Sequence, residues 1–236
     1  MKICIIGAGI TGLTIGKLLH NRHEVIILEK QPYIGGIART KKVNGVTYHL
    51  VGGHCFNSKN PMVLDFVFNR VLSKDNWHKI KRIAKILFRG RYISYPIEYS
   101  VKEIASFDEE LAYQIIIDYI LAQQTNIKPN NLAEWFEIQF GKTLAQEYFI
   151  PYNRKIWKQD LVNMDYEWVK DKLPIPNMRG FLKSLISKDE DSMPHKEFYY
   201  PNSNDMNTFI NALAAGLDIR TNFKVFSIEK RDKNWI

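Results

Sequence analysis

The sequence contains only two cysteines, Cys4 and Cys55, among its 236 residues. Two cysteines are too few for the disulfide framework of a small secreted protein, so we expect a chain that folds in the reducing cytoplasm. Neither cysteine belongs to a cluster with the spacing of a metal site, so no metal is predicted. Cys4 falls within an apolar run, and we expect it to pack in the core as a small apolar side chain.

Long apolar runs are also missing. No stretch approaches the roughly 20 apolar residues that a transmembrane helix needs, so no transmembrane segment is predicted. The first segment lacks the basic start and the uninterrupted apolar core of a signal peptide. With 45% apolar residues, the chain is long enough to bury a sizeable core, in one large or two small domains.

Motifs for binding nucleic acid are absent as well, although the formal net charge is +8. Part of the excess lies in one stretch without an acid, which contains Lys79, Lys81, Arg82, Lys85, Arg89 and Arg91. A basic stretch of this kind is compatible with a solvated face, with an anionic substrate or with an anionic surface. We predict that nucleic acid is not a partner.

What the N-terminus does contain is a dinucleotide-binding pattern. Residues 2–6 form an Ile-rich run that predicts a buried parallel strand, and Gly7-Ala8-Gly9-Ile10-Thr11-Gly12 follows at once. Gly7 permits the tight turn, Gly9 lets backbone approach phosphates, and Gly12 lets the next helix pack closely on the strand. The helix begins at Ile10 and Thr11, where unpaired N–H groups and the helix dipole would bind a pyrophosphate.

A second strand, Glu24–Glu29, ends in a carboxylate 17 residues after Gly12. At this place Glu29 can accept hydrogen bonds from ribose hydroxyls and would repel a 2′-phosphate, so NADP is not expected. Gly35-Gly36 then lets another loop approach the same dinucleotide, and Asn44-Gly45 predicts a hairpin over residues 40–50. An NAD-dependent dehydrogenase would leave these later glycines without a purpose, so the pattern favours FAD.

The remaining sequence predicts a second, mainly helical part. Two strands surround Arg89-Gly90-Arg91, and capping boxes at Ser100 and Ser106 start two helices, the second of which should stop before Pro129. Further helices are predicted at residues 131–140 and 143–149, and Pro151 should stop the last one. We predict an α/β fold in which a Rossmann-like FAD-binding domain carries an inserted helical cap or substrate domain. Its parts are residues 1–76, the insertion at 77–197, and a return to the FAD-binding domain at 198–236, with short strands at 219–220 and 224–229.

These motifs resemble the FAD-binding half of the flavin amine oxidase superfamily. More narrowly, they resemble the UDP-galactopyranose mutases and the protoporphyrinogen-oxidase-like proteins of polysaccharide loci. The matching stretches are Gly7–Leu13, Leu28–Lys30, Ile34–Gly36, Thr40, Gly52–Phe56, Arg91–Pro96, Glu134–Phe136, Phe140-Gly141, Pro151–Trp157 and Leu173–Pro176. Family members continue for more than a hundred further residues, so we expect a truncated chain.

The resemblance implies FAD as cofactor, with contacts that extend beyond the glycine turn. It implies that Lys30 and Gly53 lie along the cofactor, and that the backbone of Val225 meets the adenine from a strand returning to the sheet. The chain departs from the family after Gly35-Gly36, where Ile37 replaces a frequent Arg or Asn. Arg39 is then the basic residue predicted to contact the cofactor.

His54 is the candidate catalytic residue, because the resemblance places Gly52-Gly53-His54 near the flavin ring. Its imidazole could tune the flavin or transfer a proton, and a purely structural role stays open. For the substrate, the resemblance implies that Arg91, Tyr95, Arg154 and Trp157 hold a nucleotide sugar. Trp157 could stack on a base and Arg154 could contact phosphate, while packing and surface roles for them stay open.

The sequence therefore predicts an FAD-dependent oxidoreductase that acts on a small anionic substrate, such as a nucleotide sugar in polysaccharide biosynthesis. One alternative is a UDP-galactopyranose mutase-type isomerase, in which the reduced flavin attacks the anomeric carbon of the sugar. The other is a nucleotide-binding fragment without catalysis. The oligomeric state is not predicted by any motif, and a homodimer stays open.

Overall fold

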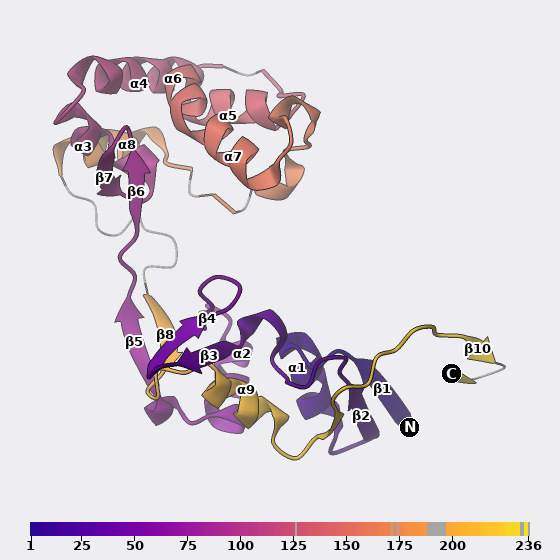
Figure 1. Ribbon diagram of the computed structural model, residues 1–236. Coiled ribbons are helices and arrows are strands. Elements are labelled where there is room, and N and C mark those ends of the chain that lie inside the picture. Colours follow the sequence, from indigo (N-terminus) through magenta and orange to yellow (C-terminus); the bar gives the residue numbers. More distant parts are fainter. Residues whose placement is uncertain (126, 171, 174, 188–196, 232–233, 236) are drawn as a thin grey trace. The chain divides into compact units, whose positions relative to one another are not determined.

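The structure is a computed structural model that describes residues 1–125, 127–170, 172–173, 175–187, 197–231 and 234–235. The chain forms two compact units (Figure 1). Unit 1 consists of Met1–Lys81 and Glu197–Ile236, and unit 2 is Arg82–Lys196. The predicted boundary after residue 76 falls just before a strand that pairs within unit 1.

A three-stranded parallel sheet organises unit 1. Its strand order is β1 (Lys2–Ile6), β2 (Glu24–Leu28) and β9 (Asp218–Arg220), and α1 (Ile10–Leu19) connects the first two strands. The Ile- and Val-rich sequences of β1 and β2 favour the extended backbone. Leu13 on α1 and Ile27 on β2 are fully buried in the unit 1 core, which confirms the predicted β–α–β start of the fold.

The other elements of unit 1 include two antiparallel strand pairs and two helical segments. In chain order they are β3 (Thr40–Val43), β4 (Val46–His49), α2 (Pro61–Asp65) with its π-helical continuation η2 (Phe66–Val71), β5 (Trp77–Lys81), β8 (Glu197–Pro201) and α9 (Asn207–Ala214). Strands β3 and β4 form the predicted hairpin. Asn44 and Gly45 both have positive φ, 50° and 83°, as the tight two-residue turn requires.

The exposure of Cys4 corrects the sequence prediction. Along β1, Ile3 and Ile5 are half-buried, whereas Cys4 and Ile6 are exposed. Because side chains alternate between the two faces of a strand, a core position for Cys4 requires both faces of β1 to be covered. In the described part of the chain only the face that carries Ile3 and Ile5 packs against the core.

The segment after β9 also differs from the prediction. Residues 224–229 form no strand, so the prediction of a sheet strand at Val225 is wrong. The backbone leaves β2 after two hydrogen bonds, from Asn222 N–H to the Gln31 carbonyl (3.1 Å) and from Phe223 N–H to the Glu29 carbonyl (2.8 Å). Beyond them, β10 (Lys230–Arg231) pairs only with β11 (Asn234–Trp235).

Unit 2 is mainly helical around an aromatic core. Its elements are the β6 (Lys85–Phe88) and β7 (Arg91–Ser94) hairpin, then α3 (Val101–Ala105), α4 (Glu109–Ala122), α5 (Leu132–Phe140), α6 (Lys142–Leu144), α7 (Ile150–Trp157) and α8 (Met178–Ile186). The rings of Tyr119 and Phe181 stack 3.9 Å apart, and those of Phe140 and Phe149 stack 4.2 Å apart. This fully buried aromatic packing fixes α4, α5 and α8 around one core.

Two predicted helix boundaries in unit 2 are wrong, and one is right. The cap of α4 is Asp108, whose carboxylate accepts from Leu111 N–H, rather than Ser106. Ser100 is the N-cap of α3 as predicted, but its hydroxyl donates to the Ser94 carbonyl and makes no helix-capping bond. Pro151 does not stop a helix, because it occupies the first turn of α7, where a missing N–H costs nothing.

The glycine turn allows a test of the predicted packing of α1. A Cβ on Gly12 would lie 2.0 Å from the Gly7 carbonyl oxygen, whereas a Cβ on Gly9 would meet no atom within 4 Å. We predict that Gly12→Ala lowers the free energy of unfolding by about 1–3 kcal/mol, because the clash with backbone outweighs the helix propensity of Ala, which is worth about 1 kcal/mol.

Gly9→Ala is the matched control, and it should unfold at nearly the wild-type denaturant concentration. Urea unfolding followed by circular dichroism measures both variants. Equal destabilisation of Gly9→Ala and Gly12→Ala would contradict the packing argument.

Candidate functional site

The glycine turn at the end of β1 is held from two sides. Gly7 has a φ of 98°, and its N–H donates to the Leu28 carbonyl at 2.8 Å. The next amide, Ala8 N–H, donates to a carboxylate oxygen of Glu29 at 2.8 Å. Gly35 N–H donates to the Ala8 carbonyl at 2.8 Å, which fastens the second glycine loop to the first. The turn is therefore rigid before any ligand binds.

The start of α1 presents backbone donors beside this turn. The first intrahelical bond runs from Leu13 N–H to the Gly9 carbonyl (3.0 Å), so the amides of Ile10, Thr11 and Gly12 precede the helical ladder. Helix N-termini with such amides attract anions, and the helix dipole adds to the attraction. The open space at the missing Gly9 Cβ leaves room for a phosphate to approach the backbone.

A groove of about 520 Å³ opens over the turn. Its lining residues are Ile5, Ile6, Gly7, Gly9, Ile10, Thr11, Gly12, Ile15, Gly35, Ile37, Ala38 and His54. The structure thus brings most of the predicted glycine-turn residues and His54 to one cavity of unit 1. Gly36 borders it, because a Cβ there would lie 3.2 Å from the Gly9 Cα. A turn without side chains, amides at a helix start and an open groove together fit a dinucleotide.

Glu29 has a structural task that the sequence did not reveal. Its side chain is buried, and its two carboxylate oxygens accept from Ala8 N–H at 2.8 Å and Gln31 N–H at 2.9 Å. The carboxylate therefore fixes the glycine turn against the end of β2. Each carboxylate oxygen can accept a further bond, so contacts to ribose hydroxyls stay a prediction.

The other predicted cofactor residues lie outside the groove lining. Arg39 stacks on the Tyr33 ring, 3.4 Å from its centroid, and lines a separate pocket of about 350 Å³. Ile37 takes the place on the groove that Arg39 was predicted to have. Lys30 and Gly53 are exposed, and Val225 is half-buried. Their contacts with a cofactor stay predictions.

His54 belongs to a small polar network. Its Nδ1–H donates to the Gly52 carbonyl at 2.9 Å, and its backbone N–H donates to His49 Nδ1 at 3.4 Å. Because His49 Nδ1 accepts, its Nε2 carries the proton of the neutral ring and donates to the Tyr200 hydroxyl oxygen at 2.8 Å. Burial, and next the charge of His54, lower the pKa of His49, while Asp205 raises it. This network favours a neutral His49 beside His54.

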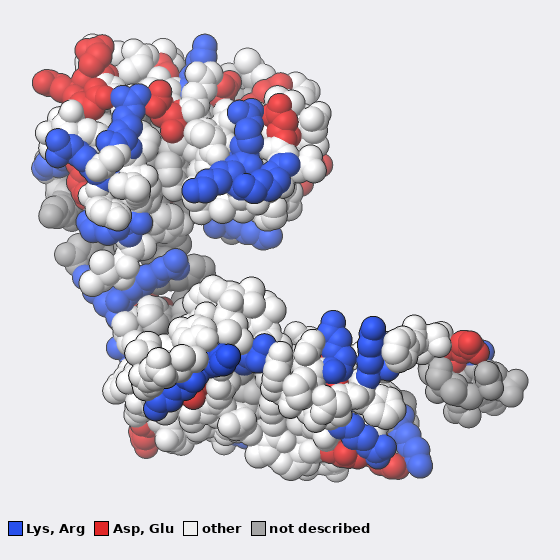
Figure 2. All heavy atoms as spheres, viewed as in Figure 1, with Lys and Arg blue, Asp and Glu red and all other residues white. Residues whose placement is uncertain are grey.

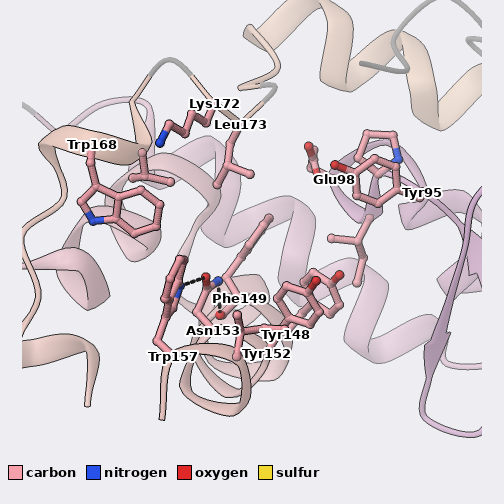
Figure 3. Close-up of a pocket in the computed structure, with 14 residues that line it drawn as sticks. Tyr95, Glu98, Tyr148, Phe149, Tyr152, Asn153, Trp157, Trp168, Lys172 and Leu173 are labelled. Atoms are coloured by element: carbon pink, nitrogen blue, oxygen red, sulfur yellow. Dashed lines mark hydrogen bonds between the residues drawn. The ribbon is translucent and has the colours of Figure 1, made fainter. Parts of the chain in front are cut away.

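Unit 2 contains a pocket of about 270 Å³ with mostly aromatic walls (Figure 3). It is lined by Tyr95, Pro96, Ile97, Glu98, Tyr148, Phe149, Tyr152, Asn153, Ile156, Trp157, Trp168, Val169, Lys172 and Leu173. The rings of Trp157 and Trp168 meet edge to face at 5.1 Å, and those of Tyr148 and Tyr152 stack at 5.4 Å. Trp157 Nε1–H donates to Asn153 at 3.2 Å, which orients the indole.

Two of the four predicted substrate residues line this pocket, and two do not. Tyr95 and Trp157 lie on its walls, and their contact with a substrate stays a prediction. Arg154 instead pairs with Asp160 at 3.1 Å on the surface, and Arg91 lies with its guanidinium 5.4 Å from the Phe107 ring centroid. Figure 2 shows basic side chains over α7, where Arg154 and Lys155 lie in the last turn.

The basic stretch of the sequence is partly neutralised in the structure. Arg89 forms ion pairs with Asp108 and Glu147, both at 2.7 Å, and Lys79 pairs with Glu197 at 2.6 Å. In Figure 2, acidic side chains accordingly lie among basic ones over β6, β7 and α4. Arg89 is therefore a structural cation of unit 2.

Glu98 is one of the pocket residues that sequence reasoning missed. It lies in the short helical turn η4 (Ile97–Tyr99), with only 3% of its surface exposed. Burial raises the pKa of its carboxyl to about 8. An acid in the apolar stretch after Tyr95-Pro96 was the available signal, because a carboxyl there has little chance of full solvation.

Comparisons with known proteins agree with this geometry. The family described as NAD(P)-binding Rossmann-like domain matches residues 5–69. The UDP-galactopyranose mutase of Mycoplasma genitalium is 23% identical over 94% of this chain and 54% of its own length. The dTDP-fucopyranose mutase of Escherichia coli is 26% identical over 66% of this chain and 41% of its own. A crystal structure of reduced UDP-galactopyranose mutase superposes with a TM-score of 0.81 at 25% identity, over 94% of this chain and 48% of the other.

The resemblance to UDP-galactopyranose mutases is confirmed. So is the Rossmann-like α/β fold of the dinucleotide-binding part. A protoporphyrinogen oxidase-like protein from Exiguobacterium, 16% identical with a TM-score of 0.69 over 99% of this chain and 55% of its own, shares the fold. The chain spans about half the length of the relatives that it matches.

The described residues contain neither a membrane-spanning helix nor a cluster that could bind a metal ion. In that part of the chain no helix has both the length and the apolar character needed to span a bilayer. The same residues contain no cluster of three or more His, Cys, Asp or Glu side chains placed to bind a metal ion.

The buried carboxyl of Glu98 gives a pH prediction. Its folded pKa, about 8, lies above its ordinary value of 4.5, so its stabilising neutral form is fully present below 4.5. We predict that the free energy of unfolding falls by a few kcal/mol as pH rises from about 4.5 to 8. Over this range the unfolded chain has lost the Glu98 proton and the folded chain still holds it. Glu98→Gln, which stays neutral, should flatten this dependence. Urea unfolding of both full-length proteins at several pH values, followed by Trp fluorescence, measures this dependence. Identical pH profiles of the two proteins would contradict the prediction.

Proposed function

We propose that this chain binds FAD in the unit 1 groove and belongs to a flavin-dependent nucleotide-sugar mutase. The observation that carries the proposal is the meeting of the glycine turn, the start of α1 and His54 on one groove. Two of the relatives that match the chain are a UDP-galactopyranose mutase and a dTDP-fucopyranose mutase. Their reaction comes to this chain only as part of the proposal.

The groove residues have distinct tasks in this proposal. The amides of Ile10, Thr11 and Gly12 bind the pyrophosphate, and Gly9 lets it approach. Glu29 holds the turn in shape and accepts from a ribose hydroxyl with its remaining lone pairs. Gly35 and Gly36 bring the second loop against the turn. When bound in its reduced form, the flavin supplies the nucleophile for exchange at the sugar anomeric carbon.

The unit 2 pocket is the proposed nucleotide-sugar site. Aromatic walls of Trp157, Tyr148 and Tyr152 offer faces for a base or a sugar ring, and Tyr95 adds a hydroxyl. The oxidoreductase alternative is supported by fold likeness at 16% identity, which carries less weight than the mutase relatives. A nucleotide-binding chain without catalysis is the second alternative, and turnover of UDP-sugars by the chain distinguishes it from the first.

FAD uptake tests the groove directly. We predict that the purified chain binds FAD, with a visible absorption spectrum that bleaches with dithionite. Gly9→Ala places a methyl group in the groove, so its Kd for FAD should rise at least about tenfold, equivalent to about 1.4 kcal/mol.

Thr14→Ala, on α1 but away from the groove lining, is the control and should bind FAD as the wild type does. Fluorescence titration with FAD gives the three values. A wild-type chain that takes up no FAD would refute the cofactor assignment for this chain.

His54 is proposed to contact the flavin. His54→Ala should retain FAD but shift the two-electron reduction potential of the bound flavin by about 30 mV, because a polar ring near the flavin is lost. His78→Ala, an exposed histidine of β5, is the matched control and should leave the potential unchanged. Dye-coupled reductive titration measures both variants, and equal potentials in all three proteins would leave His54 with its structural role only.

A further inference from the structure

Unit 1 has a second cavity at the end of α1 that is remote from the glycine turn. It has a volume of about 390 Å³ and shares no lining residue with the dinucleotide groove. The ten residues of α1 separate the two ends of the helix by roughly 15 Å. No described residue of the cavity lining is acidic, and the lining includes Lys17, Leu18, His20, Arg22, Phe66 and Arg70.

Two of the three cations in this lining lack a carboxylate partner. Within the described part of the chain, neither Lys17 nor Arg22 forms an ion pair. Lys17 Nζ donates to the Ala215 carbonyl at 2.7 Å, which anchors the ammonium beside the end of α9. An ammonium has three N–H donors and a guanidinium has five, so both cations keep donors for an anion.

The carbonyls at the end of α1 are satisfied by the protein itself. The His20 N–H donates to the Gly16 carbonyl, and His20 Nδ1–H donates to the Lys17 carbonyl, both at 2.9 Å. The His23 N–H donates to the Leu19 carbonyl at 3.0 Å. Free carbonyls at a helix C-terminus would repel an anion and would occupy nearby cations. Because these carbonyls have donors already, the basic side chains are not needed to cap the helix.

Arg70 reaches the cavity from the π-helical segment η2. The Leu72 N–H donates to the Val67 carbonyl at 2.9 Å, five residues back, which is the bond of a widened turn. Phe66 and Arg70 lie about one such turn apart, and both line the cavity. Short π-helical segments are rare in proteins and occur frequently at functional sites. The widened turn thus adds a third cation and an aromatic ring to the same cavity.

Asp65 is the acid that competes for Arg70, although it does not line the cavity. Its Oδ2 lies 3.7 Å from Arg70 Nη2, while its Oδ1 accepts from Asn69 Nδ2 at 2.8 Å. The side chains of Asp65 and Arg70 are 53% and 68% exposed, and an ion pair so exposed contributes little to stability. Arg70 can therefore bind another anion at little cost.

We propose that this cavity is a phosphate site, in which Lys17, Arg22 and Arg70 hold the phosphate group of a monoester. Charge-assisted bonds from three cations on two elements suit a phosphate dianion. The half-buried Phe66 and the exposed Leu18 offer apolar contacts to the carbon skeleton of the ester. This site is additional to the proposed FAD groove and does not depend on the proposed function. No covalent step is involved.

Calorimetric titration of the full chain with glycerol 3-phosphate tests the site, and glycerol, which has no phosphate, should not bind. Arg22→Gln and Arg70→Gln should each raise the Kd at least about tenfold, because each loses charge-assisted hydrogen bonds to the phosphate. Lys42→Gln is the matched control, since it removes one positive charge from an exposed position of β3 outside the cavity lining. It should bind as the wild type does.

Asp65→Asn should change the affinity in the opposite direction. We expect its Kd to be about two- to fivefold lower than that of the wild type, because the acid that competes for Arg70 is lost. A substitution that only loosened the fold would weaken binding, so structural damage cannot imitate this result. A Kd equal to or above the wild-type value would overturn the assignment of Arg70 to the site.

Two probes distinguish the sources of the phosphate. Glycerol 3-phosphate is a soluble ester, whereas vesicles of phosphatidylcholine with phosphatidic acid present the same group on a lipid. Binding of the soluble ester supports a metabolite, and binding to the vesicles alone supports a lipid headgroup, provided that Arg22→Gln weakens it. If neither probe binds, or if wild type, Arg22→Gln and Lys42→Gln bind equally, the site is overturned. Equal binding would place the phosphate elsewhere, such as at the start of α1. Thermal unfolding of each variant confirms that the proteins compared are folded.

Discussion

The hydrogen bond from Ala8 N–H to the Glu29 carboxylate is the contact on which unit 1 depends. It joins the end of β2 to the glycine turn after β1, while the second carboxylate oxygen accepts from Gln31 N–H. A buried carboxylate is stable only where its charge is compensated by donors, and these two amides provide them. The turn shape, the direction of α1 and the groove above the turn all follow from this arrangement.

The bond also gives the acid at the end of the second strand a role within the protein. Sequence spacing assigned Glu29 to the ribose, which is an interaction with a ligand. The structure gives the same carboxylate a partner in the protein, so loss of Glu29 would disturb the turn before any cofactor arrives. A substitution at Glu29 therefore cannot separate cofactor binding from folding, whereas a methyl group at Gly9 can, because it enters empty space.

Local patterns predicted the features of unit 1 that depend on neighbouring residues. The Gly7–Gly12 turn, the β3–β4 hairpin at Asn44-Gly45 and the strand–helix–strand order required only backbone preferences and short spacings. Cys4 and Val225 were mispredicted because their environments depend on distant segments: which face of β1 is covered, and where the chain after β9 leaves the sheet. The pairing of Arg89 with Asp108 and Glu147 also joins residues far apart in sequence, so a charge count could not detect it.

In the candidate site of unit 2, residue type alone also failed to identify which side chains line the pocket. Sequence and resemblance selected Arg91 and Arg154 because cations suit phosphates, yet Arg154 is paired with Asp160 and Arg91 lies against Phe107. The pocket instead places a single carboxyl among phenols and indoles, with Lys172 on its other side. Such a carboxyl is tolerated because it can stay neutral, and a neutral acid is a donor as well as an acceptor. Recognition by this pocket would thus rest on hydrogen bonding and stacking at one end and on charge at the other, rather than on a cluster of arginines.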